Sequence, residues 1–121
     1  MNILYVEDNA ANARLVARYL ALKPGVSLYA AASAEQGLTL AKTQPLDLIL
    51  MDINLPGMSG IDALLSLRRE PALSAIAVVA VSADALPDKI RAAMALGFDD
   101  YLTKPLDFVR FDAVIARYRP A

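Results

Sequence analysis

Four apolar runs of the sequence end in side chains that can do ionic or nucleophilic chemistry. These ends carry Glu7 and Asp8, Asp52, Ser82, and Lys104 followed by Pro105. Three carboxylates repel one another unless a cation neutralises them, and oxygen-only ligands favour a hard ion such as Mg²⁺. A carboxylate beside Mg²⁺ and a lysine can attack a phosphoryl group, whose oxygens a hydroxyl and an ammonium then stabilise. The set predicts metal-assisted phosphoryl chemistry if the fold brings it together.

Each of these residues also has a purely structural interpretation. The alternatives are helix capping for residues 7–9, a turn for Asp52, an internally bonded hydroxyl for Ser82 and a solvated surface cation for Lys104. A further acidic pair, Asp99 and Asp100, lies at the entry to the last predicted strand, so it is expected at the opposite end of the sheet and is assigned to the surface. The joint placement at successive strand ends favours the functional interpretation.

Alternating strand and helix signals must position these residues. Apolar runs bounded by turn residues predict strands at 3–6, 26–31, 48–51, 76–81 and 98–102. Helical spacing and cap signals predict helices at about 10–22, 33–43, 61–69, 87–96 and 106–119. The first of these has Leu15, Val16, Tyr19, Leu20 and Leu22 at helical spacing. Five βα units predict an α/β fold with a parallel sheet, whose ligand site lies beyond the carboxyl ends of the strands.

Composition narrows the classes of function. The chain has 121 residues, no Cys, no His and a net charge of 12 − 13 = −1. The length predicts one domain, residues 1–121. The missing Cys and His exclude disulfides, thiolate or imidazole metal sites, and catalysis through a thiol or imidazole of this chain. The charge predicts no binding of nucleic acid or anionic membrane.

Apolar residues make up 57% of the chain, and the mean hydropathy is +0.41. A membrane span does not explain this, because the apolar runs are about 5–8 residues long and a bilayer needs about 20. The N-terminus lacks the basic region of a signal peptide, so a cytoplasmic location is expected. Strands buried on both faces, as in a helix-covered parallel sheet, account for the apolar content.

Four sequence blocks resemble the receiver domain of the two-component response-regulator family. They are VEDN at 6–9, LMDINLPGMSG at 50–60, VSA at 81–83 and YLTKPL at 101–106. The resemblance covers essentially the whole chain. It implies a flavodoxin-like (βα)5 fold, a doubly wound five-stranded parallel sheet with strand order 2-1-3-4-5.

The resemblance also implies a role for each site residue. Asp52 is the phosphoacceptor. Lys104, whose peptide bond to Pro105 is implied to be cis, pairs first with Asp52 and then with a phosphoryl oxygen. The implied Mg²⁺ ligands, which also accept Mn²⁺, are Asp8, Asp52, the backbone carbonyl of Asn54 and, largely through water, Glu7. Ser82 moves its hydroxyl to the phosphoryl group and Tyr101 turns inward behind it, while Asn54 and Asp84 tune hydrolysis. The alternative for Tyr101 is a half-buried strand aromatic.

Two family positions carry a variant residue, and neither damages the implied mechanism. Glu7 replaces the more usual Asp, which bears on metal affinity, and Ser82 stands where Thr is also common.

The resemblance implies a phosphohistidine donor, which this His-free chain cannot supply. We therefore expect a histidine kinase or a histidine phosphotransfer domain to dock on the first helix and the loop after the fifth strand. Ala10, Ala11, Ala13 and Arg14 are small or basic there, although alanine also simply favours helix. With no room for an output domain, we expect either a monomer or weak dimer that acts by contact or a fragment of a longer protein. The blocks resemble both stand-alone receivers and those of hybrid histidine kinases. Two other functions stay open: a small Mg²⁺-dependent phosphohydrolase with Asp52 as nucleophile, and an interaction module that is never phosphorylated.

Overall fold

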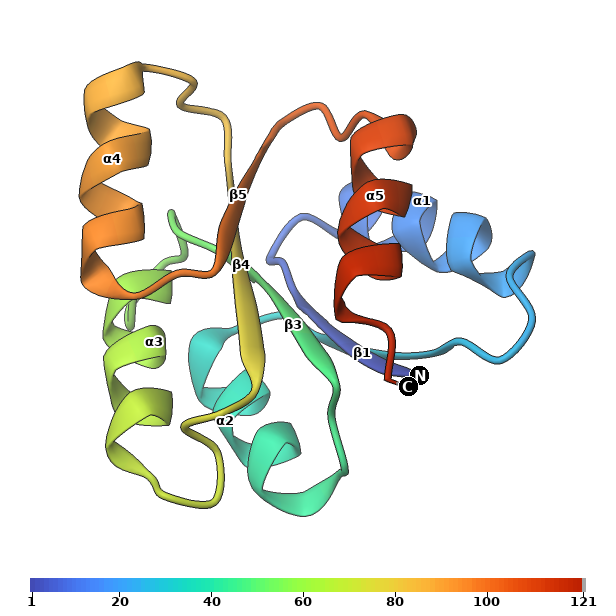
Figure 1. Cartoon of the computed structure of the whole chain (residues 1–121), viewed down its shortest axis with the longest axis horizontal. Coiled ribbons are helices and arrows are strands. Elements are labelled where there is room, and N and C mark those ends of the chain that lie inside the picture. Colours follow the sequence, from blue (N-terminus) through green and yellow to red (C-terminus); the bar gives the residue numbers. More distant parts are fainter. Residues whose placement is uncertain (121) are drawn as a thin grey trace.

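The computed structural model describes residues 1–120 and contains one parallel sheet between two layers of helices (Figure 1). The strands are β1 (Asn2–Val6), β2 (Ser27–Ala31), β3 (Leu48–Asp52), β4 (Ala77–Ser82) and β5 (Asp100–Thr103). Their order is β2-β1-β3-β4-β5 and every pair is parallel. The predicted α/β class and strand order are confirmed.

The helices alternate with the strands and cover both faces of the sheet. They are α1 (Ala10–Ala21), α2 (Ala34–Thr43), α3 (Gly60–Arg69), α4 (Pro87–Leu96) and α5 (Phe108–Tyr118). Helices α2, α3 and α4 pack on one face, and α1 and α5 on the other, as Figure 1 shows. Among residues 1–120, no helix is long and apolar enough to cross a membrane.

Two apolar layers explain the high apolar content of the chain. All five residues of β3 are buried, and four of the five in β1 are buried as well. Side chains alternate along each strand, so Ile49 and Met51 face the layer under α2–α4, whereas Leu48 and Leu50 face α1 and α5. Each such fully buried side chain stabilises the fold by roughly 1.5–3 kcal/mol. The central strands therefore hold the residues at their ends in fixed positions.

Most element boundaries differ from the sequence prediction by one or two residues. Gly97 adopts a left-handed φ of +117° and ends α4, as a C-terminal glycine should. Phe98, predicted as the first residue of the last strand, is instead buried in the connection, and β5 begins at Asp100. On α1, Leu15 is 52% exposed, and Leu22, predicted as the last apolar residue of this helix, is instead its C-cap and is 82% exposed. Apolar spacing gives the orientation of a helix but not the edge of the layer that it covers.

Asp99 has a structural role that the assignment to the surface missed. Its Oδ2 accepts a hydrogen bond from the buried backbone N–H of Val78, at 2.8 Å, and one from the Arg68 guanidinium, at 2.9 Å. Arg68 also donates to the carbonyl oxygens of Ser74, Ile76 and Gly97. Asp99 and Arg68 therefore fasten the start of β4 to α3, at the end of the sheet away from the acidic residues.

Asp99→Ala should lower the free energy of unfolding by about 2 kcal/mol, the usual cost of leaving a buried backbone N–H unsatisfied. Urea denaturation measures this loss. Glu70→Ala is a suitable control, because Glu70 forms only an exposed ion pair with Lys42 at 3.6 Å, worth about 0–1 kcal/mol. Equal losses in the two variants would show that the bond from Asp99 to Val78 adds no stability.

Candidate functional site

The parallel sheet brings the four chemically interesting strand ends to one edge. Val6 pairs with Met51, so Glu7 follows β1 beside Asp52, the last residue of β3. Ser82 ends β4, and its carbonyl accepts a 2.8 Å hydrogen bond from the backbone N–H of Lys104, which follows β5. The predicted convergence is present. It lies beside the β1–β3 boundary, where the strand order reverses and where ligands of open α/β sheets bind.

Helix α1 does not use the carboxylates of Glu7 or Asp8 as its cap. Its N-cap is Asn9, whose Oδ1 accepts a 3.1 Å hydrogen bond from the backbone N–H of Asn12. Because one residue caps the helix, the two acidic residues before it remain available to the sheet edge.

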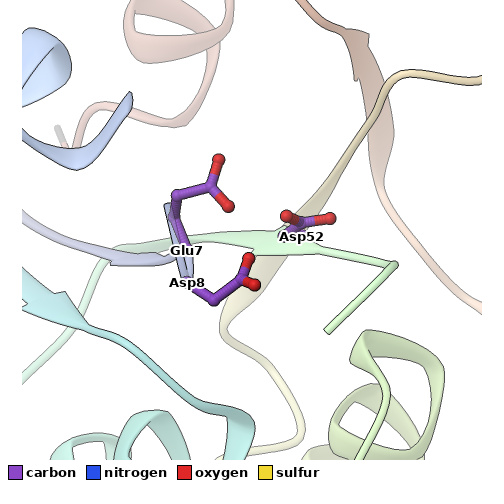
Figure 2. Close-up of side chains that lie close together, drawn as sticks. All are labelled: Glu7, Asp8 and Asp52. Atoms are coloured by element: carbon purple, nitrogen blue, oxygen red, sulfur yellow. The ribbon is translucent and has the colours of Figure 1, made fainter. Parts of the chain in front are cut away.

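Three carboxylates form one cluster at this edge. Glu7, Asp8 and Asp52 each place an oxygen within 4.8 Å of the others, and Figure 2 shows the Glu7 and Asp8 side chains directed toward Asp52. Glu7 and Asp52 are buried, whereas Asp8 is exposed. The cluster therefore has a dry side and a side open to solvent.

Lys104 is the cation that balances part of this charge. Its Nζ lies 2.7 Å from Asp52 Oδ2 and 2.7 Å from Glu7 Oε1, so one ammonium serves two carboxylates. The peptide bond from Lys104 to Pro105 is cis, as the resemblance implies. Three carboxylates against one ammonium leave a formal excess of two negative charges.

The shared environment shifts the acidities of the cluster. Burial raises the pKa of Asp52, and the neighbouring Glu7 adds to the rise. Burial acts on the pKa of Glu7 in the same direction, but its neighbours Asp52, Lys104 and Asn12 outweigh it and hold the pKa at about 2. The two carboxylates outweigh burial at Lys104 and raise its pKa, while burial and Glu7 raise the pKa of Tyr5 far above its ordinary range. At neutral pH, Glu7 is thus ionised, Lys104 is charged and Tyr5 keeps its proton.

The cluster fits a divalent metal ion. Glu7 Oε2 is buried and has no hydrogen-bond partner within residues 1–120, although a buried carboxylate oxygen is expected to be bonded. The available ligands are all oxygens, which suits a hard cation. Both the unpartnered oxygen and the excess of two negative charges point to the same kind of ion.

The connection from β3 to α3 is held tightly against Asp52. The backbone N–H of Asn54 donates to Asp52 Oδ1 at 2.9 Å, and that of Gly60 donates to the carbonyl of Ile53 at 3.1 Å. A Cβ at position 60 would overlap the Asp52 carbonyl oxygen and would lie 2.9 Å from Ile53 Cα. The first turn of α3 therefore requires a glycine where it crosses the end of β3.

Ser82 and Tyr101 lie on the α4 side of the site. Ser82 Oγ accepts from the side-chain amide of Asn54 at 3.4 Å and from the backbone N–H of Asp84 at 3.1 Å. Tyr101 is only 4% exposed, and its hydroxyl donates to the Asp84 carbonyl at 2.7 Å. Tyr101 is thus already turned inward and is not the half-buried aromatic of the alternative interpretation. The Asp84 carboxylate accepts from the backbone N–H of Leu86, within its own loop.

Tyr5 and Asn12 also belong to the site, although neither was predicted from the sequence. Both donate to Glu7 Oε1, the Tyr5 hydroxyl at 3.2 Å and the Asn12 side-chain amide at 3.0 Å. Tyr5 stands two residues before Glu7 and thus on the same side of the extended chain, a spacing that could have identified it. Asn12 carries no comparable signal, because its position follows from the direction in which α1 leaves β1.

The sequence and the structure were also compared with those of known proteins. A family profile described as "Response regulator receiver domain" matches residues 3–116. The hybrid signal transduction histidine kinase G of Dictyostelium discoideum is 38% identical over 123 residues, which cover 99% of this chain and 4% of that kinase. The chain spans 4% to 51% of the length of such curated relatives.

Two solved receiver domains have the same fold. One is that of the sensor histidine kinase PA1611 from Pseudomonas aeruginosa PAO1, with a magnesium ion coordinated in its active site cleft. It is 29% identical, with a TM-score of 0.86 over 97% of this chain and 95% of that one. The other is that of Saccharomyces cerevisiae Ssk1, in complex with the histidine phosphotransfer protein Ypd1. It is 29% identical, with a TM-score of 0.87 over 98% of this chain and 88% of that one.

The match with the profile covers nearly the whole chain, and the conserved architecture of these neighbours agrees with it. The chain therefore belongs to the response regulator receiver domain family, whose members are signalling modules of two-component phosphorelays.

Proposed function

We propose that this receiver domain takes a phosphoryl group onto the carboxylate of Asp52 from a phosphohistidine of a partner. The observation that carries the proposal is the setting of Asp52. Its carboxylate is buried at the end of β3, bonded to Lys104 and flanked by two further carboxylates. A carboxylate so placed can act as a nucleophile toward phosphorus, and the ammonium beside it can stabilise the oxygens of the transferred group.

In the proposed step, an Asp52 oxygen forms a bond to phosphorus while the bond between phosphorus and the imidazole nitrogen of the donor breaks. The electron pair of that bond goes to the imidazole, which takes a proton from solvent. Lys104 Nζ is already 2.7 Å from Asp52 Oδ2 and needs little movement to reach a phosphoryl oxygen. Asn54 and Asp84 flank this position and are proposed to tune hydrolysis of the product.

Magnesium is the cofactor that we propose for this step, with Mn²⁺ as a substitute. Asp8 and Asp52, together with the backbone carbonyl of Asn54, would hold the ion directly, and Glu7 would act largely through water. When bound, the ion neutralises charge on the carboxylates and on the phosphoryl oxygens. The three clustered carboxylates and the magnesium-bound receiver of PA1611 support this assignment.

We further propose that phosphorylation rearranges the surface formed by α4, β5 and α5. A phosphoryl group adds about −1.5 to −2 charges at one point, which attracts the Ser82 hydroxyl and the backbone N–H of Ala83. Ser82 Oγ now accepts the backbone N–H of Asp84, whose carbonyl holds Tyr101. Movement of Ser82 would therefore break a chain of contacts that connects the site with the side chain of Tyr101.

A histidine kinase or histidine phosphotransfer domain is the partner that we propose for α1 and the loop after β5. Between them lies a hollow of about 70 Å³, lined partly by Leu15, Lys104 and Leu106. Leu15 is half exposed and Arg14 is exposed on α1, so the face offers apolar and basic contacts near Asp52. The complex of Ssk1 with Ypd1 supports a histidine phosphotransfer protein as the partner.

Incubation with Mg²⁺ and acetyl phosphate, followed by measurement of the intact mass, tests the proposal. We expect one added phosphoryl group in the wild-type chain, far less without Mg²⁺, and none in Asp52→Asn, which lacks the nucleophilic carboxylate. Asp62→Asn is the control, because Asp62 lies exposed on α3 and should accept the substitution without effect. Phosphate release with no gain in mass would instead indicate a phosphohydrolase, and neither gain nor release would indicate an interaction module.

A further inference from the structure

Tyr5 introduces a hydroxyl into β1, where its neighbours Ile3, Leu4 and Val6 are aliphatic. The side chain is 1% exposed and packs in the apolar layer under α1 and α5. Its hydroxyl nevertheless reaches the acidic cluster and donates to Glu7 Oε1 at 3.2 Å. A buried tyrosine hydroxyl requires such a partner, and here the partner is one of the three clustered carboxylates.

The two oxygens of Glu7 have very different surroundings. Oε1 accepts hydrogen bonds from Tyr5 and from Asn12 and contacts the ammonium of Lys104. Oε2 is buried and has no partner among the described residues. Two neutral donors, Tyr5 on β1 before Glu7 and Asn12 on α1 after it, thus hold Oε1. They leave Oε2 without a hydrogen bond from the described residues.

We propose that Tyr5 and Asn12 are positioning residues that hold the Glu7 carboxylate with Oε2 available to the metal ion. This inference rests on the metal site of the proposed function. A glutamate has one more rotatable bond than an aspartate, so fixing its side chain costs more conformational entropy. Because the hydrogen bonds fix Glu7 in the folded protein, this entropy is already lost before the ion binds, and binding of the ion is stronger.

The hydrogen bonds from Tyr5 and Asn12 to Glu7 also make it easier for Lys104 to move. Lys104 now serves Glu7 and Asp52 together, at 2.7 Å from each. When it turns toward a phosphoryl oxygen, Oε1 of Glu7 still keeps Tyr5 and Asn12 as donors. Lys104 can therefore leave Glu7 without leaving a buried oxygen unsatisfied, which would destabilise the site.

Calorimetric titration of the unphosphorylated protein with Mg²⁺ tests the proposal without any readout of phosphorylation. Tyr5→Phe removes one oxygen atom and keeps the ring, and we expect the Kd for Mg²⁺ to rise about 3- to 10-fold, corresponding to one lost hydrogen bond. Asn12→Ala should raise it by a similar factor, since it removes the second donor. Tyr19→Phe is the matched control, because the Tyr19 hydroxyl also donates to a carboxylate, that of Asp112 at 2.7 Å, but between α1 and α5. It should leave the Kd unchanged.

A double-mutant cycle separates positioning of Glu7 from a general effect on packing. Glu7→Asp withdraws the carboxylate from Tyr5, so Tyr5→Phe should have little further effect on Mg²⁺ affinity in that background. An unchanged Kd in both Tyr5→Phe and Asn12→Ala, with normal binding by the wild-type chain, would overturn the inference and leave the metal site intact. Absence of Mg²⁺ binding by the wild-type chain would overturn the metal site itself and the inference with it.

Discussion

Lys104→Met is expected to lower the free energy of unfolding of the metal-free protein by about 3 kcal/mol, the low end of what loss of one partner from a buried ion pair costs. The side chains of Glu7 and Asp52 are 0% and 4% exposed, and Lys104 is the one cation within 4 Å of either in residues 1–120. Methionine fills a similar volume but supplies no charge. The variant therefore leaves two buried carboxylates facing each other. Urea denaturation without divalent ions measures the loss.

Magnesium should restore much of the stability that this variant loses. An ion that binds only the folded state at 100 times its Kd stabilises that state by about 2.7 kcal/mol, and removal of the ammonium also removes its repulsion of the ion. The difference in free energy of unfolding between Lys104→Met and wild type should thus be smaller in the presence of Mg²⁺. Lys23→Met is the control, because Lys23 pairs with the half-exposed Asp112 at 2.8 Å, and such surface pairs are worth about 0–1 kcal/mol. Equal losses in both variants, or a gap that Mg²⁺ does not change, would contradict the role given to Lys104.

The loss in free energy of unfolding that Lys104→Met causes should also become smaller as the pH falls from 7. Burial already raises the pKa of Asp52, and Lys104 acts against that rise, so loss of Lys104 raises the folded-state pKa further. A carboxyl with a raised folded pKa binds its proton more tightly in the folded state, so its cost to stability grows with pH above the unfolded value of about 3.9 and vanishes well below it. Denaturation curves at several pH values check this direction.

Gly60→Ala is the second substitution with a large expected effect. Helix propensity alone predicts a gain of about 1 kcal/mol for alanine inside a helix. The structure reverses the sign, because the added Cβ would meet backbone atoms of Asp52 and Ile53, which cannot turn aside as a flexible side chain can. Overpacking of this kind costs about 1–3 kcal/mol, and occasionally more. We expect a loss of about 3 kcal/mol and a weakening of Mg²⁺ binding of at least about tenfold (about 1.4 kcal/mol), since β3 and α3 must separate at the acidic cluster.

Gly25→Ala provides the comparison for this effect. Gly25 has a φ of +75°, and a Cβ there meets nothing within 4 Å, so alanine should cost only the left-handed strain of about 1–2 kcal/mol. Its Mg²⁺ affinity should equal that of the wild type, because the turn lies between α1 and β2, remote from the sheet edge. Urea denaturation and calorimetric titration of both variants measure the two effects. Wild-type Mg²⁺ affinity in Gly60→Ala would show that the close crossing does not hold the site in shape.

The sequence was sufficient for the architecture because its signals are local. Each strand is a short apolar run, and Ser59, Asp107 and Gly97 mark helix ends through bonds or backbone angles within a few residues. Asp99 is exposed, as predicted, but its bond to the N–H of Val78 was not foreseen because Val78 comes from another strand and the contact depends on register. The exposure of Leu22 was missed because periodicity does not give the extent of the layer beneath a helix.

The site was predictable to the extent that it follows from strand ends. Glu7, Asp52 and Lys104 meet because parallel strands end together, and this geometry applies to any sequence with the same order of elements. Tyr5 and Asn12 escaped notice because their contribution is a hydrogen bond to a side chain rather than a place at an edge. The inward position of Tyr101 depends on the path of the loop after β4, which composition does not specify.

The end of β4 also divides the molecule into parts of different local stability. Ser82 is the last residue of its ladder, paired with Thr103, and lies on strands that are almost wholly buried. The next residue, Ala83, is exposed and belongs to a loop secured mainly by Asp84. Segments with few buried contacts open at far lower free energy than core strands. The peptide bond after Ser82 is thus the border between a frame that opens only with global unfolding and a segment that can reorganise alone.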